Sequence, residues 1–101
     1  DIMTGGGNAD VFVFVAAAQS AVGSKRDQIV DFKAGIDKLD FSAFMAGGKF
    51  IGGSEFTAGN GPQIRYTAAG IVSGDVGGDG ITDFQLNLLG APILTAGDIL
   101  F

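Results

Sequence analysis

This sequence of 101 residues contains no cysteine, no histidine and no tryptophan, and it has only two prolines. Without cysteine it has neither a disulfide framework nor thiolate metal ligands. Without histidine it has no Ser-His-Asp set, no H-E-x-x-H zinc motif and no imidazole base. Most of its acidic residues stand beside glycine in turn-like contexts, so we expect no active site and no enzymatic activity in this chain.

Positive charge is also scarce, with 6 basic residues against 11 acidic ones and a net charge of -5. This balance argues against a nucleic-acid-binding surface and suits a cation-binding protein, although an ordinary acidic domain has the same composition. No apolar run approaches the ~18 residues of a membrane span. No basic segment precedes an apolar stretch at the N-terminus, so a cleavable signal peptide is not expected here.

Glycine is abundant, with 18 residues. The most informative glycines lie near the start of the sequence. Residues 5–13 follow the nonapeptide pattern G-G-x-G-x-D-x-U-x, a calcium-binding repeat of parallel β-helices. Residues 1–4 match its second half, so we expect the chain to begin inside a repeat of a longer protein. Glycine-rich turns can point carbonyl oxygens inward, and Asp10 supplies a carboxylate, as a hard cation with six to eight oxygen ligands requires. One turn cannot complete that shell, so stacked turns are needed.

One position departs from the pattern, because Asn8 stands where the fourth residue is normally glycine. Asparagine tolerates the left-handed backbone region, so the turn is compatible with it. The alternative interpretation is a plain glycine-rich loop before a strand. The half repeat that precedes it in phase favours the calcium-binding interpretation.

The rest of the chain reads as short strands between glycine-rich turns. Residues 11–15 form an apolar run typical of a strand buried on both faces. In residues 81–89 apolar and polar side chains alternate, which predicts an antiparallel sheet with one wet side. Residues 42–46 predict a short helical turn capped by Ser42.

Two further acidic groups occur. The first, Asp75, Asp79 and Asp83, resembles part of an EF-hand loop, but the third loop position is Gly77 and no glutamate closes the loop. A hairpin turn at residues 79–80 is the favoured interpretation. In the second group, spread over residues 27–40, one carboxylate is expected to reach back to the calcium shell of the last repeat, and Asp37 is chosen because it lies in a turn.

Taken in order, four segments resemble the C-terminal region of serralysin-type RTX proteases. They are G-G-G-N-A-D-V-F-V-F at residues 5–14, D-Q-I-V-D-F-K-A-G-I-D-K-L-D-F-S at 27–42, G-D-G-I-T-D-F-Q at 78–85 and the terminal D-I-L-F at 98–101. The resemblance spans nearly the whole chain and is least specific over residues 46–63.

The resemblance implies an all-β fold, namely the end of a calcium-binding parallel β-roll followed by an antiparallel β cap. We expect residues 1–15 to be the last turns of the roll, and residues 16–101 to be the cap with a C-terminal secretion signal. Phe101 would then be the natural C-terminus. The calcium-contacting positions implied by the family, with the turn residue chosen above, are Asp1, Gly5, Gly6, Gly7, Asn8, Asp10 and Asp37, where the glycines and Asn8 act through carbonyls.

The implied partners are the upstream RTX repeats and catalytic domain of the parent protein and a type I secretion exporter. The protein would be secreted and extracellular. A serralysin-like zinc metalloprotease is the leading interpretation of the parent, although its zinc site cannot be placed in this chain. The same C-terminal layout occurs in RTX lipases, alginate epimerases, adhesins and surface-layer proteins. A self-contained binding module with no calcium response is the third alternative.

Overall fold

The computed structural model describes residues 2–4, 6, 9–14, 27–59 and 61–101, with the backbone alone for Ile2 and Met3. Within this part the chain is nearly all β, and the helical element is the short 3₁₀ turn η2, Ala96–Asp98. No helix in the described ranges is long and apolar enough to cross a membrane. The all-β prediction is therefore confirmed.

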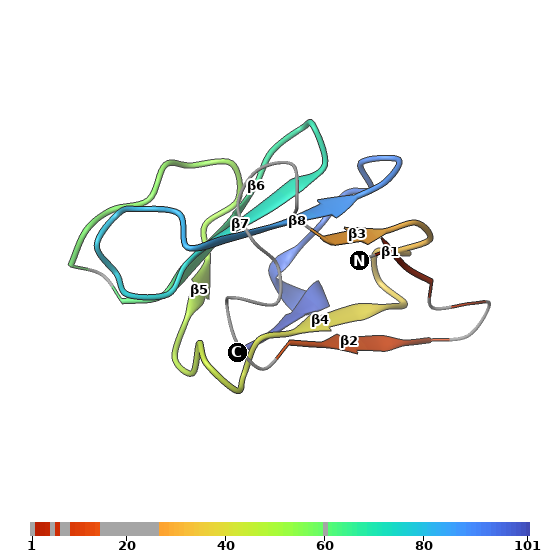
Figure 1. The fold of residues 1–101 in the computed structure, drawn as a ribbon, viewed down its shortest axis with the longest axis horizontal. Coiled ribbons are helices and arrows are strands. Elements are labelled where there is room, and N and C mark those ends of the chain that lie inside the picture. The colour runs from red at the N-terminus through yellow and green to blue at the C-terminus, as the bar shows by residue number, and fades with distance from the viewer. Residues whose placement is uncertain (1, 5, 7–8, 15–26, 60) are drawn as a thin grey trace.

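The strands form two sheets. The six-stranded sheet has the order β1-β3-β8-β7-β6-β5, and the three-stranded sheet has the order β2-β4-β9. Their bounds are β1 Ile2–Met3, β2 Val11–Val13, β3 Asp27–Ile29, β4 Lys38–Asp40, β5 Lys49–Phe50, β6 Gln63–Tyr66, β7 Ile71–Asp75, β8 Phe84–Leu88 and β9 Ile99–Leu100. Figure 1 shows β4 and β2 as a separate layer from β3, β8 and β7.

Within the described residues the chain passes from the large sheet to the small one through β1–β2, β3–β4 and β8–β9. We call these segments coil 1 (residues 2–13), coil 2 (residues 27–40) and coil 3 (residues 84–100). Successive coils pair in parallel in both sheets. This repeated parallel winding is consistent with the β-roll that the sequence predicted.

The antiparallel part is smaller than expected. Strand β7 pairs antiparallel with β6 and with β8, whereas β8 also pairs parallel with β3. Parallel pairing thus also lies on the C-terminal side of the boundary predicted after residue 15. The antiparallel strands are an excursion between coils 2 and 3 that includes β5, itself parallel to β6.

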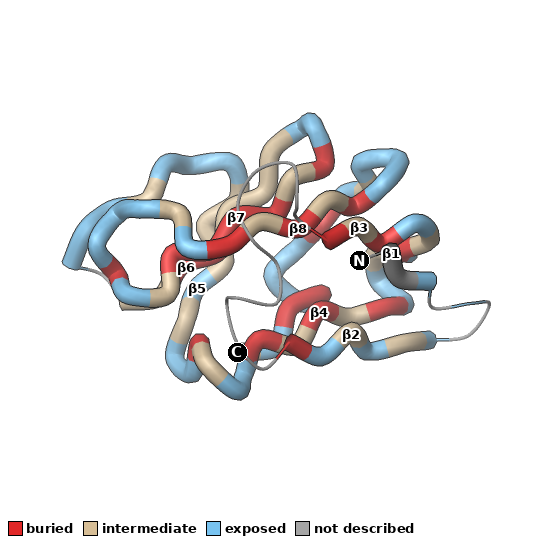
Figure 2. Tube along the Cα trace, viewed as in Figure 1, coloured by how far each residue is buried: buried red, intermediate tan, exposed pale blue. Residues whose placement is uncertain are grey.

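The core lies between the two sheets. Figure 2 shows β7 and β8 largely buried, whereas β4 has one buried residue, Leu39, between two half-buried ones. Strand β8 has the predicted alternation, because Phe84, Leu86 and Leu88 are buried while the residues between them are half-buried. Phe41, which follows β4, packs against Phe84 with ring centroids 5.2 Å apart, and this contact joins the sheets.

The prediction that the run at residues 11–15 is buried on both faces is wrong for β2. Val11 and Val13 are 53% and 58% exposed, while Phe12 between them packs against the core. Among the described residues β2 pairs with β4 at the edge of the three-stranded sheet, where Phe12 lies opposite the buried Leu39 and the flanking residues of β2 are exposed. An apolar run therefore indicated the strand correctly but not the burial of both its faces.

Candidate metal centre

Gly6 is the residue of the opening glycine run that the structure describes. Gly6 has φ +91°, in the region that side chains with a Cβ rarely adopt. Its N–H donates to Asp31 Oδ2 of coil 2 at 2.8 Å. The other predicted calcium-contacting residues of this turn, Asp1, Gly5, Gly7 and Asn8, lie outside the described residues.

Asp10 ends this turn and is held by its backbone. Its N–H donates to Asp37 Oδ1 at 2.9 Å, and its carbonyl accepts from Lys38 N–H at 2.8 Å. Its side-chain Oδ2 is buried and has no hydrogen-bond partner among the described residues. A carboxylate oxygen removed from water without a partner is costly, and such groups are normally paired in native proteins.

A cation is a chemically suitable partner for this oxygen. Calcium binds carboxylate and backbone carbonyl oxygens, and the Gly5–Asp10 turn provides both types. The orphaned Asp10 Oδ2 therefore fits the calcium-binding interpretation of the motif. Of the predicted calcium-contacting residues, Gly6, Asp10 and Asp37 lie among the described residues.

Asp37 lies beside this turn, but it uses both oxygens for hydrogen bonds. The residue is 1% exposed; Oδ1 accepts from Asp10 N–H at 2.9 Å and Oδ2 from Lys33 N–H at 3.0 Å. It does reach back from coil 2 to the opening turn, as predicted. Its role as a calcium ligand stays a prediction, and its observed contacts are with backbone amides.

Asp98 is a structural carboxylate that the sequence reasoning missed, because it was assigned only to the terminal export segment. It is 2% exposed; Oδ1 accepts from Gly35 N–H at 2.8 Å, and Oδ2 from Thr95 N–H at 3.0 Å and Thr95 Oγ1 at 3.1 Å. The Thr95-x-x-Asp98 spacing of a capping box was the signal that could have revealed it.

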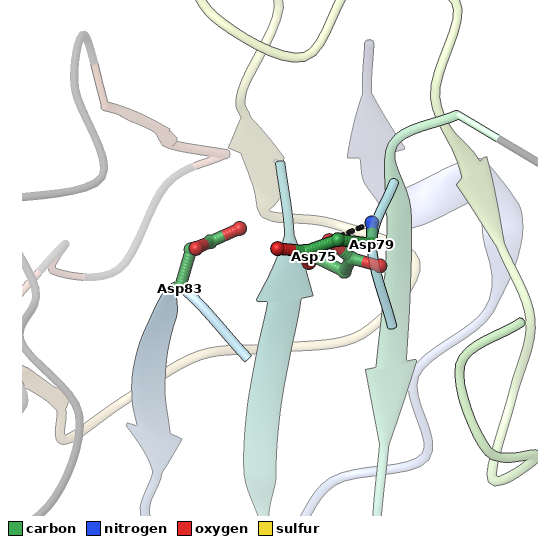
Figure 3. Close-up of side chains that lie close together, drawn as sticks. All are labelled: Asp75, Asp79 and Asp83. Carbon is green, nitrogen blue, oxygen red and sulfur yellow. Dashed lines mark hydrogen bonds between the residues drawn. The ribbon is translucent and has the colours of Figure 1, made fainter. Parts of the chain in front are cut away.

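The acidic group Asp75, Asp79 and Asp83 lies in a hairpin turn between β7 and β8. One carboxylate oxygen from each of Asp75, Asp79 and Asp83 lies within 4.8 Å of the others. Figure 3 shows these three side chains. Asp75 is fully buried and accepts N–H groups from residues 78, 79 and 80 at 3.0, 3.3 and 2.8 Å. Gly78 and Gly80 have φ values of +72° and +83°.

These contacts support the hairpin interpretation. The antiparallel pairing of β7 with β8 shows the hairpin directly, although Gly78 rather than Asp79 shares the positive φ with Gly80. Asp83 Oδ2 accepts from Val76 N–H at 2.8 Å, so this turn too is organised by amide donors. No buried oxygen of the three aspartates is left without a partner.

An apolar groove of about 320 Å³ lies on another part of the surface, between residues 66–68 and 91–94. Its lining contains no carboxylate or amine, and the Tyr66 hydroxyl donates to the Pro92 carbonyl at 2.6 Å. Burial raises the pKa of Tyr66. The groove has no group suited to proton transfer near neutral pH.

Comparison with known proteins gives a consistent result. All 101 residues match a family described as Peptidase M10 serralysin C terminal. The chain is 36% identical over 100 residues to "Serralysin" of Photorhabdus luminescens, covering 90% of this chain and 20% of that protein. It is 35% identical over 83 residues to "Metallopeptidase AprA" of Pseudomonas marginalis, covering 78% and 17% respectively. The chain thus spans no more than a fifth of these relatives.

Proposed function

The chain belongs to the family of serralysin C-terminal regions of M10 peptidases, and from this membership we propose that it is the calcium-binding, non-catalytic C-terminal region of a secreted zinc metalloprotease. Its relatives are a serralysin and a metallopeptidase, which supports a protease over the other RTX parents. The chain's own contribution is to folding and export, since it has no histidine with which to build the zinc site.

The observation that carries the calcium proposal is the buried, unpartnered Oδ2 of Asp10 in the glycine-rich turn. Asp10 would bind the ion through this oxygen, while carbonyls of residues 5–8 and the carboxylate of Asp1 would complete the shell with a preceding turn. Asp37 would hold the Asp10 backbone in place from the other side. When bound, calcium would supply the positive charge that this turn lacks.

This site makes folding depend on the medium. At low calcium the acidic chain, with its net charge of -5, repels itself and its glycine-rich turn is costly to order. Extracellular calcium modules have dissociation constants of roughly 10⁻⁴–10⁻³ M. At millimolar calcium the binding energy adds to folding by mass action. The opening turn and the repeats before it would therefore stay unordered in the producing cell and fold outside it.

The tail at residues 98–101 is proposed as the signal that a type I exporter reads. In the folded chain Asp98 and Ile99 are buried, and the Leu100 carbonyl accepts from Phe41 N–H at 2.9 Å. A tail packed in this way offers little sequence to a receptor, so the exporter would read it before folding.

Calcium binding is tested by comparing Asp10→Asn with Asp79→Asn in protein that includes the upstream repeats. Asp79 is an exposed member of the hairpin turn, so its substitution is a matched control for lost charge. Asp10→Asn should raise the calcium concentration needed for folding by about tenfold or more, as loss of a ligand requires. Asp79→Asn should leave it unchanged, and magnesium should not replace calcium. Circular dichroism that is identical with and without calcium in the wild type would reject the proposal.

Export is tested by deleting residues 98–101, with Phe41→Ala as the control. Phe41 is fully buried and its own N–H donates to the Leu100 carbonyl, so truncating its side chain weakens the packing around the tail while the tail sequence stays intact. We expect the deletion to abolish secretion through a type I exporter and Phe41→Ala to be secreted but unstable. If the deletion variant were secreted as well as Phe41→Ala, the tail would serve packing alone.

A further inference from the structure

Each coil enters the small sheet through an aspartate. Asp10 directly precedes β2, Asp37 precedes β4 and Asp98 precedes β9. The first of them has a buried oxygen without a partner, whereas no buried oxygen of Asp37 or Asp98 is unpaired. The three aspartates thus occupy equivalent positions in successive coils, but only Asp10 has an unpaired buried oxygen.

Asp37 and Asp98 share one pattern of contacts. One oxygen of each carboxylate binds the residue's own turn, through Lys33 N–H for Asp37 and Thr95 N–H for Asp98. The other oxygen binds the turn of the preceding coil, through Asp10 N–H for Asp37 and Gly35 N–H for Asp98. Each carboxylate therefore bridges two stacked turns.

A shared calcium ion would have this same position between stacked glycine-rich turns, because each turn gives it only part of a shell. From these contacts we infer that Asp37 and Asp98 are carboxylate bridges that replace the ion, so that coils 2 and 3 are joined without metal. The calcium dependence of the described turns ends at Asp10. The inference uses the proposed function only for the ion at Asp10.

The chemistry of these turns supports the replacement. Amide-to-carboxylate distances of 2.8–3.0 Å are typical of charge-assisted hydrogen bonds, which satisfy a buried carboxylate. The turns of coils 2 and 3, residues 30–37 and 89–98, lack the G-G-x-G-x-D order of the opening turn. They contain one and two glycines, so they have few positions from which carbonyls can turn inward around an ion.

The inference is tested by hydrogen exchange and mass spectrometry on the intact natural protein, refolded after purification so that export has no influence. In calcium-free buffer with EGTA, wild-type peptides that cover residues 33–41 and 95–101 should remain protected. The peptide of the opening turn should gain protection only when calcium is added. Loss of protection throughout coils 2 and 3 in EGTA would overturn the inference even if no variant folds.

The variant Asp37→Asn separates a bridge from a ligand. Asparagine keeps one acceptor oxygen but loses the charge and one of the two amide bonds. Exchange of the amides around Lys33 should rise about tenfold or more, with and without calcium, as expected when a charge-assisted bond is lost. Because Asp37 Oδ1 also holds the Asp10 N–H, the decisive readout is exchange in EGTA, where loss of a ligand alone would have no effect.

Asp98→Asn should likewise raise the exchange rate of the Gly35 amide, because Gly35 N–H donates to Asp98 Oδ1 at 2.8 Å. Asp79→Asn is the control that should leave all three turns unchanged. A raised calcium midpoint in Asp37→Asn with unaltered exchange in EGTA would show that Asp37 is a calcium ligand, and would contradict the inference. A wild-type protein without any calcium response would instead refute the proposed function and leave the bridges as observed.

Discussion

A single methyl group at Gly74 should disrupt the contact between the two sheets. Gly74 lies in β7, opposite Phe84 of β8. A Cβ at this position would lie 2.0 Å from Phe84 Cε1 and 2.3 Å from its Cζ. The ring is 1% exposed and is held by Phe41 and Phe44 at centroid distances of 5.2 and 5.6 Å, so it cannot move aside freely.

The cost follows from these contacts. Overpacking a core costs about 1–3 kcal/mol, and the trapped ring places Gly74→Ala near the upper end of that range. Replacing glycine also restricts the unfolded chain, which returns about 0.4–1 kcal/mol. The net loss in the free energy of unfolding should be about 2 kcal/mol, which lowers the Tm of a domain of this size by roughly 10 °C.

Thermal unfolding in saturating calcium measures this loss. The matched control is Gly77→Ala, because no atom lies within 4 Å of a Cβ at Gly77. Its Tm should equal or slightly exceed that of the wild type. Adding Phe84→Leu should recover part of the loss in Gly74→Ala, as coupled neighbours do. A Gly74→Ala protein as stable as Gly77→Ala would refute the reasoning.

Two further predictions concern ionisation. Hydrogen bonds from Ser42 Oγ and N–H lower the pKa of Asp40 below 3.8, so their stabilisation is complete near neutral pH and is lost as pH falls through the folded pKa. Ser42→Ala should raise that pKa in an NMR titration, and an unchanged value would contradict the assignment. Burial raises the pKa of Tyr66 above 10.0, so stability should fall as pH rises from about 10 through the folded pKa. The chain has one tyrosine, so its ultraviolet titration is unambiguous, and a pKa at or below 10.0 would refute this.

Local patterns predicted the features that depend on neighbouring residues. The alternation in β8 and the positive φ of Gly6 could both be predicted from the spacing of residues. The short turn after β4 was predicted, but its cap is Asp40, whose Oδ1 accepts the Ser42 N–H at 2.9 Å. Both residues are common in such caps, and composition alone did not distinguish them.

Pairing over long distances was not readable in the same way. Strand β3 has parallel partners at residues 2–3 and 86–88, and no local pattern encodes that register. The parallel pairing of coil 2 with coil 3 was therefore not predicted. The bridging role of Asp98 was missed for the same reason, because its partner Gly35 lies 63 residues away in the sequence.

The central claim, that Asp10 binds calcium, is tested most directly by a crystal structure of the protein with its upstream repeats, grown in calcium. The account predicts an ion about 2.3–2.6 Å from Asp10 Oδ2, in a shell of six to eight oxygens that includes carbonyls of the glycine-rich turn. An opening turn without an ion, with Asp10 Oδ2 bonded to water or to an amide instead, would contradict it.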